Sequence, residues 1–226
     1  MGVRQGAEST EMTHFPWESF ILGAVAAVAG FGLLGLNSFW SPAARRRGKT
    51  AHWLVGFGLN GLGMLLIGAG WFRLALLPPK VDWEALAWIG FAAAVAGAGL
   101  YLASAARVGR LHALSNYSIE LDVSGLYSIV RHPQALALSL LSIGLGGLSQ
   151  SIPYLALLPL WVAAWYAYSW LEEVLELVPV FGDRYREYSR TTPRMFPSPE
   201  VLADWIVERV TLFRRVPTSI RSSRRT

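Results

Sequence analysis

Five long apolar segments dominate this chain and limit strongly what it can fold into. A helix needs about 20 predominantly apolar residues to cross the hydrocarbon core of a bilayer. Only 15% of the residues are charged, against roughly a quarter in ordinary soluble domains. The sequence therefore predicts an all-α fold, a polytopic membrane helical bundle with about five transmembrane helices and a cytoplasmic C-terminal segment. The predicted membrane segments are 20–40, 53–72, 85–106, 135–148 and 152–171.

The fourth segment is short for a crossing, and a polar turn at 149–153 separates it from the fifth. A turn this tight predicts that the two segments form a helical hairpin. Pro133 stands just before the fourth segment, and proline suits the first turn of a helix. We therefore expect this shorter helix to begin inside the protein, directly after Pro133.

Lysine and arginine residues gather on one side of the predicted segments. Of the 20 such residues, all but Arg4, Arg73 and Lys80 follow the first, third or fifth segment. Cytoplasmic loops of membrane proteins carry the excess of basic residues. We therefore expect a multi-pass integral membrane protein with its N-terminus outside and its C-terminus in the cytoplasm.

The formal net charge of +5 is explained by this distribution and by a basic tail that anionic membrane lipid would attract. No basic groove studded with aromatic residues is visible, so we expect no nucleic acid partner. The absence of cysteine excludes disulfides, thiolate metal sites and cysteine nucleophiles. The four histidines are scattered without helical spacing, so the sequence predicts no metal site.

Polar residues flank the predicted hairpin at both of its cytoplasmic ends, where neighbouring hydrocarbon makes charge costly. Arg131 and His132 precede the fourth segment, and Glu172 and Glu173 end the fifth. Each pair alone is most simply interpreted as an interfacial anchor. A hairpin brings its two ends to one level, so we expect these residues and Tyr127 to meet in one cytoplasmic-facing pocket.

Such a pocket suits a small zwitterionic cofactor with a nucleoside end. Carboxylates attract an amino group or a sulfonium, whereas arginine and histidine can hold a carboxylate. Aromatic faces attract a methylsulfonium by cation–π interaction. The fifth segment offers Trp165, Tyr166, Tyr168 and Trp170 for this purpose. The chain has neither a P-loop nor a dinucleotide fingerprint on a strand.

The order of these motifs resembles the integral membrane methyltransferases of the isoprenylcysteine carboxyl methyltransferase and phospholipid methyltransferase group. Two features depart from that pattern. Ala135 stands where the family has tyrosine, and one extra residue separates the glutamate pair from Phe181. The resemblance covers roughly 120–200 and is carried by Gly125, Tyr127, Arg131, His132, Pro133, Glu172, Glu173, Phe181, Gly182, Tyr185, Tyr188, Pro193, Arg194 and Pro197.

The resemblance implies a methyltransferase that uses S-adenosyl-L-methionine and acts on a lipophilic small-molecule or lipid-modified acceptor. It leaves the catalytic residue open, with Arg194 and Glu173 as candidates. The cofactor-binding residues that it implies are Tyr127, Arg131, His132, Pro133, Glu172, Glu173 and Tyr185.

These expectations divide the chain into three parts. Residues 1–110 would hold the first three membrane helices, 111–200 the motif-bearing core with the hairpin, and 201–226 a basic cytoplasmic tail. Two alternatives remain open for the function. One is an NADPH-dependent membrane reductase of the sterol reductase type, which shares a similar C-terminal pattern. The other is a non-catalytic membrane helical protein, for which Ala135 and the extra residue are the best support.

Overall fold

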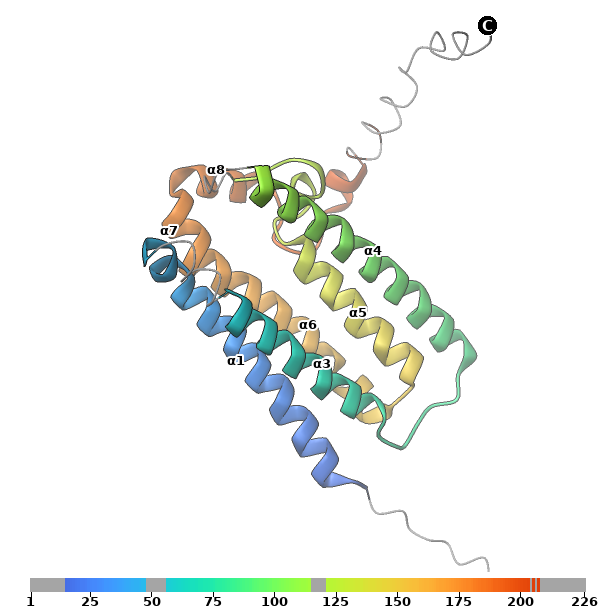
Figure 1. Ribbon diagram of the computed structural model, residues 1–226. Helices are drawn as coiled ribbons and strands as arrows, with labels where there is room; N and C mark the ends of the chain where they lie inside the picture. Colours follow the sequence, from blue (N-terminus) through green and yellow to red (C-terminus); the bar gives the residue numbers. More distant parts are fainter. Residues whose placement is uncertain (1–14, 48–55, 115–120, 204, 206, 208–226) are drawn as a thin grey trace, which may run out of the picture.

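The computed structural model describes residues 15–47, 56–114, 121–203, 205 and 207 of the chain. Over these ranges the protein is all-helical and contains no β-strand. Its long helices lie side by side in an elongated bundle (Figure 1). They are α1 (Trp17–Arg47), α3 (Leu62–Ala75), α4 (Glu84–Leu114), α5 (Pro133–Ser149) and α6 (Ile152–Glu172).

Shorter elements complete the described part of the chain. They are η1 (Gly56–Gly61), which leads into α3, η2 (Gly125–Ser128) before α5, and η3 (Glu173–Leu177), α7 (Val178–Phe181) and α8 (Asp183–Thr191) after α6. The five predicted apolar segments each correspond to helix, although residues 53–55 of the second lie outside the described residues. Most of the basic tail expected at 201–226 also lies outside them.

Two helices are long and apolar enough to cross a membrane, namely α1 over Trp17–Trp40 and α4 over Glu84–Arg107. α5 is apolar but shorter, as its predicted segment suggested. α6 has 21 residues and contains tyrosines, tryptophans and two prolines. The all-helical fold and the presence of membrane-length helices thus follow from the apolar pattern.

Close backbone contacts hold the helices in two pairs, α1 with α3 and α4 with α5. A Cβ atom added to Gly30 would lie 2.5 Å from the carbonyl oxygen of Gly63, and one added to Gly147 would lie 2.6 Å from the Cα of Gly90. Small residues allow this approach between membrane helices. The sequences of α1 and α4 are similar where these contacts are made: 23–33 in α1 reads GAVAAVAGFGL, and 90–100 in α4 reads GFAAAVAGAGL.

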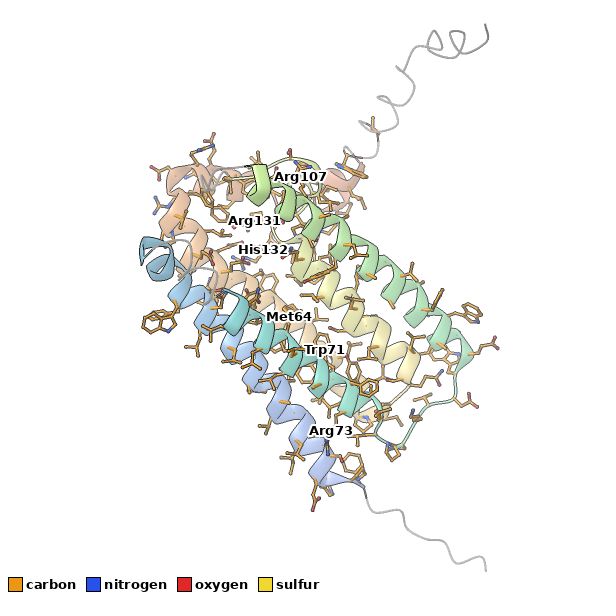
Figure 2. All side chains as sticks on the ribbon, in the orientation of Figure 1. Met64, Trp71, Arg73, Arg107, Arg131 and His132 are labelled. Atoms are coloured by element: carbon orange, nitrogen blue, oxygen red, sulfur yellow. The ribbon has the colours of Figure 1, made fainter. Side chains whose placement is uncertain are left out.

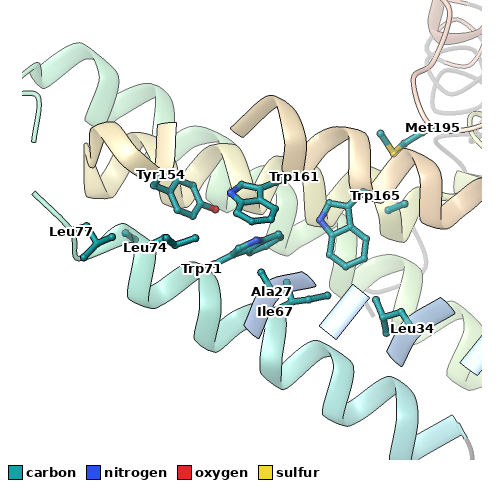
Figure 3. Packing of buried hydrophobic residues seen from close by; sticks show 12 residues of the cluster. Ala27, Leu34, Ile67, Trp71, Leu74, Leu77, Tyr154, Trp161, Trp165 and Met195 are labelled. Atoms are coloured by element: carbon teal, nitrogen blue, oxygen red, sulfur yellow. The ribbon is translucent and has the colours of Figure 1, made fainter. Parts of the chain in front are cut away.

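Tryptophans fill the space between the α1–α3 pair and α6 (Figure 3). The ring of Trp71 lies 6.1 Å from that of Trp161 and 6.0 Å from that of Trp165, measured between centroids. Phe31 of α1 packs edge-on against Trp165 at 4.8 Å. These side chains belong to the hydrophobic core, and they pack α6 against the first helix pair.

The α5–α6 hairpin forms as predicted, through a turn at Gln150 with a left-handed φ of 56°. The loop after α3 is hydrogen-bonded to this turn. The amide of Val81 donates to the carbonyl of Gln150 at 2.8 Å. The hydroxyl of Ser151 donates to the carbonyl of Leu74 at 3.0 Å. The turn of the hairpin therefore lies at one end of the bundle, and its two open ends, with the residues that flank them, lie at the other.

Basic residues occupy both ends of the bundle but differ in role. Arg107, Arg131 and His132 lie at the end where α4 finishes and α8 lies, and Arg73 lies at the opposite end (Figure 2). Arg73 is exposed and donates to the hydroxyl of Ser19 at 3.4 Å. The candidate site therefore lies at the Arg107 end.

Candidate functional site

The loop that enters α5 carries the first group of site residues. Gly125 opens the η2 turn with a φ of 64°, a conformation that favours glycine. Tyr127 follows within the turn, and its carbonyl accepts a hydrogen bond from the hydroxyl of Tyr188 in α8. His132 is the residue before α5, and Pro133 occupies the first position of that helix, where a missing amide proton costs nothing.

The end of α6 carries the second group. Glu172 closes α6, and the chain then widens into the π-helical turn η3. A π-turn holds more residues than an α-helical turn and occurs often at functional sites. Glu173 and Glu176 are both buried within this turn.

The segment after α8 carries the third group and is joined to the first by backbone hydrogen bonds. The amide of Arg131 donates to the carbonyl of Pro193, and the amide of His132 donates to that of Arg194, both at 2.9 Å. Met195 follows with no exposed surface and packs into the core cluster, which also contains Ala135. This anchoring turns the side chain of Arg194 toward the end of α6.

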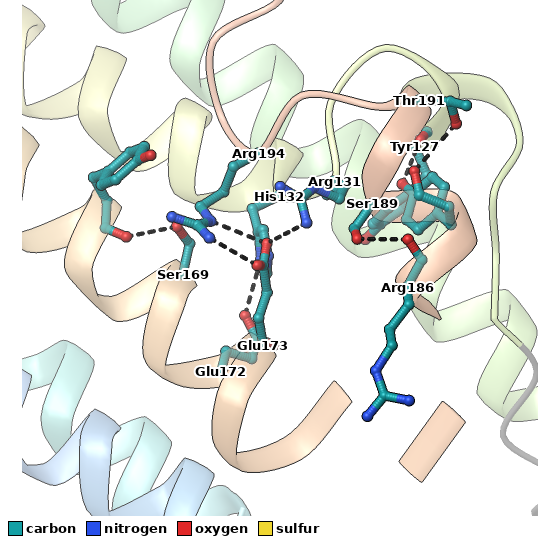
Figure 4. A network of polar contacts seen from close by, with 12 residues as sticks. Tyr127, Arg131, His132, Ser169, Glu172, Glu173, Arg186, Ser189, Thr191 and Arg194 are labelled. Carbon is teal, nitrogen blue, oxygen red and sulfur yellow. Dashed lines mark hydrogen bonds and ion pairs between the residues drawn. The ribbon is translucent and has the colours of Figure 1, made fainter. Parts of the chain in front are cut away.

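Glu173 lies at the centre of the three groups (Figure 4). Its Oε1 lies 3.1 Å from Nη1 of Arg131, 3.0 Å from Nε2 of His132 and 3.1 Å from Nε of Arg194. Its Oε2 accepts from Nη2 of Arg194 at 3.0 Å, so Arg194 forms a bidentate ion pair with the carboxylate. The Glu173 side chain is only 7% exposed, which strengthens these charge-assisted contacts.

His132 stands between two carboxylates. Its Nδ1 lies 3.1 Å from Oε2 of Glu172, and its Nε2 lies 3.0 Å from Oε1 of Glu173. Ionised carboxylates only accept hydrogen bonds, so both ring nitrogens must carry protons. Burial opposes this charge, but the hydrogen bonds to Glu172 and Glu173 outweigh it and raise the pKa of His132. The two carboxylate contacts and the raised pKa together favour the protonated, cationic form of His132.

The same contacts shift the pKa of Glu173 in the opposite direction, below its ordinary value. Burial alone would raise the pKa of Glu173, but the hydrogen bonds from His132 and Arg194 outweigh burial and lower it to about 2. Arg194 also lies over the ring of Tyr166, with its Cζ 5.1 Å from the centroid. The guanidinium thus connects the buried carboxylate to a half-exposed aromatic face of α6.

One buried donor in this region, Nε of Arg131, has no hydrogen-bond partner among the described residues. The hydroxyl of Tyr185 lies close to Glu173. Burial raises the pKa of Tyr185, and the negative charge of Glu173 and a hydrogen bond to it add to the effect, so Tyr185 stays a neutral donor. An unpaired buried donor such as Nε of Arg131 is uncommon and calls for an explanation.

The structure brings the residues singled out from the sequence to one end of the bundle. Arg131, His132, Glu172, Glu173 and Arg194 form one contact network. Burial raises the pKa of Tyr127 to about 12, with the charge of Glu172 adding to it. Trp165, in contrast, lies in the core with Trp71 and Phe31 and not at the network.

Sequence reasoning missed other participants. Asp122 and Ser124 contact Arg107 beside the η2 turn, and Met195 anchors the last segment. The one available signal was the pair of polar residues just before Gly125, which no spacing rule connects to Arg107. Within the described residues, no three His, Cys, Asp or Glu side chains group as metal ligands.

Comparisons with known protein families, curated proteins and solved structures give no match to this chain. The motif resemblance therefore rests on the residues of the sequence alone.

Proposed function

We propose that this protein is an integral membrane methyltransferase that uses S-adenosyl-L-methionine and methylates a lipophilic acceptor. The observation that carries the proposal is the convergence on Glu173 of Arg131, His132 and Arg194. These side chains come from two segments far apart in the sequence and meet at the end of a third. The motifs that resemble the isoprenylcysteine carboxyl methyltransferase group lie in these same segments.

The donor set at the site fits such a cofactor. The unpaired Nε of Arg131 is suited to the cofactor's carboxylate. The Glu172 side chain is 31% exposed and is suited to an amino group or ribose hydroxyls. Pro133 and Tyr127 would shape the wall beside them. Bound S-adenosyl-L-methionine would supply the electrophilic methyl group.

The chain's own residues would then orient the partners and exclude water. Displacement at a methyl carbon needs the acceptor held in line and within near-attack distance. Arg194 is fixed between Glu173 and the Tyr166 ring, so it is placed to orient an acceptor head group. The segment that contains Pro193 and Met195 would cover the site. Glu173 would act by holding Arg131, His132 and Arg194 in position.

The membrane placement belongs to the same proposal. We propose five crossings, with the N-terminus outside, the C-terminus in the cytoplasm and the Glu173 network at the cytoplasmic end. The cofactor would arrive from water, and the acceptor from membrane lipid. The distribution of basic residues supports this orientation, because the positive charge of cytoplasmic loops fixes topology.

One observation favours a second candidate, a non-catalytic membrane protein. Both oxygens of Glu173 are already paired with the chain's own cations. A network whose carboxylate is already paired can serve only to hold the hairpin and the last segment together. Cofactor binding and turnover separate this candidate from the first.

The test uses the full chain purified in detergent. We expect calorimetry to detect binding of S-adenosyl-L-methionine, with no binding of NADPH. Glu172→Gln should weaken binding by roughly ten- to a hundredfold, since it removes one charged hydrogen-bond partner. Glu187→Gln, an exposed change on α8, is the matched control and should bind normally. Absence of binding would refute the cofactor assignment, and NADPH binding would favour the reductase.

Turnover tests the acceptor. Labelled methyl transfer into a total lipid extract should yield a lipophilic product. One reactive head group carried on a short and on a long alkyl chain should react faster on the long chain, because burying an unpaired polar acceptor in hydrocarbon is costly. Cofactor binding without any transfer would instead favour the non-catalytic candidate.

A further inference from the structure

Arg107 ends the membrane-length part of α4 and holds the loop that leads to the site (Figure 2). Its Nε and Nη2 donate to the two oxygens of Asp122, the second at 3.1 Å. Nη2 also donates to the hydroxyl of Ser124. The Asp122 carboxylate in turn accepts from the amide and the hydroxyl of Ser124, at 3.1 and 2.8 Å.

The guanidinium also lies against the backbone of Gly125. A Cβ atom added to this glycine would lie 2.9 Å from Nη1 of Arg107. Gly125 has a φ of 64°, so a larger residue would strain the backbone and would also have to displace the Arg107 guanidinium. Arg107, Asp122, Ser124 and Gly125 thus form one clamp at the start of the η2 turn.

The clamp holds one side of the loop, and the last segment holds the other. Tyr188 donates to the carbonyl of Tyr127, and the amide of Arg131 donates to the carbonyl of Pro193. Between these supports lie the side chains that reach toward the end of α6. The position of α4 therefore bears directly on where Tyr127, Arg131 and His132 lie.

We infer that Arg107 is a positioning residue: its clamp on Asp122, Ser124 and Gly125 orients the loop that presents Tyr127, Arg131 and His132 to the cofactor. This inference rests on the proposed methyltransferase function for its ligand, but the orientation of the loop can be tested without one. Arg107 makes no contact with Glu173 among the hydrogen bonds and ion pairs of the described residues.

The chemistry of the clamp requires arginine. A planar guanidinium grips a carboxylate with two parallel hydrogen bonds and so fixes direction as well as distance. Lysine keeps the charge but is a point donor and cannot reproduce this grip. Burial opposes the charge of Asp122, but the hydrogen bonds from Arg107 and Ser124 outweigh it and lower the pKa of Asp122. The carboxylate therefore stays ionised and available to the clamp.

The clamp is better suited to positioning than to overall stability. The Arg107 side chain is 33% exposed, and ion pairs with water access contribute little to folding. The α4–α5 contact, in contrast, depends on glycines deeper in the bundle, such as Gly90 and Gly147. Loss of the clamp should release the loop and leave the helix pairs in place.

The experiment compares four variants of the full chain in detergent: Arg107→Lys, Arg107→Asp, Asp122→Arg and the double variant Arg107→Asp/Asp122→Arg. Arg73→Lys, at the opposite end of the bundle, is the matched control. Hydrogen exchange of peptides covering 121–132 reports loop order without ligand. Melting temperature and S-adenosyl-L-methionine affinity are measured beside it.

We expect each single variant to exchange faster in 121–132, with the helices and melting temperature unchanged and affinity reduced by about 10- to 100-fold. The double variant should recover part of both losses, which a general loss of packing would not allow. Unchanged exchange in 121–132, or faster exchange throughout α4 and α5, would overturn the positioning role. A wild-type protein that binds no S-adenosyl-L-methionine would refute the proposed function, while the exchange data would still decide the clamp.

Discussion

Neutralising Glu173 should destabilise the protein as well as impair its site. Glu173→Gln keeps the size of the side chain but removes the charge that pairs with Arg131, His132 and Arg194. Those three cations would remain in a buried region without this counter-charge. Breaking a buried ion pair by removing one partner is strongly destabilising for this reason.

The size of the effect follows from the pKa of Glu173, which falls from 4.5 to about 2. This difference favours the ionised form in the folded protein by about 3 kcal/mol at neutral pH. Because the folded pKa is the lower one, this stabilisation is present above 4.5 and is lost as the pH falls toward 2. The Glu173 side chain is 7% exposed, so solvent screening removes little of it.

The assay is thermal unfolding in detergent at a series of pH values. We expect Glu173→Gln to melt well below the wild type at neutral pH, and the gap to narrow as the pH falls below 4.5. Glu187→Gln, with an exposed carboxylate on α8, should melt with the wild type throughout. Equal melting of Glu173→Gln and the wild type at neutral pH, or a gap that does not close on acidification, would refute the charge argument.

Three further predictions concern His132, the contact between α4 and α5, and the membrane topology. The pKa of His132 is raised in the folded protein, so its protonation stabilises the fold fully below pH 6.5, and this stabilisation is lost as the pH rises through the folded pKa. The melting temperature of His132→Gln should therefore fall less than that of the wild type over this pH range. Gly147→Ala should cost about 1–3 kcal/mol of stability, because its Cβ would meet the backbone of Gly90, whereas Gly99→Ala, with open space around it, should cost nothing in the same unfolding assay. Reporter fusions at Phe72 and Thr226 should read outside and cytoplasmic respectively, and a reporter at Thr226 that reads outside would reject the proposed topology.

The sequence predicts the helices well because apolar composition and polar turns are local properties. α6 begins at Ile152 and α5 ends at Ser149, as the polar turn between them suggested. Pro133 begins α5 because its ring suits the first turn of a helix. The hairpin then follows, and with it the approach of His132 to the two glutamates.

The contacts that the sequence could not predict depend on tertiary packing. Nothing local indicates that the segment at Pro193 pairs with the backbone of Arg131, or that Met195 is fully buried. The clamp of Arg107 on Asp122 spans 15 residues, and some of them lie outside the described chain. Trp165 could face either the site or the core by its position on α6, and only the neighbouring Phe31 and Trp71 place it in the core.

The pairing within the network connects its stability to the proposed ligand. Arg131, His132 and Arg194 contact Glu172 and Glu173, and Glu176 is buried in the same turn as Glu173. A buried polar group is costly unless it is hydrogen-bonded, and Nε of Arg131 has no partner among the described residues. We propose that a ligand carboxylate would pair with that nitrogen. Its amino group would turn to Glu172, whose side chain is more exposed than that of Glu173. The proposed ligand therefore carries a carboxylate and a cationic group a few atoms apart, as an amino acid moiety does.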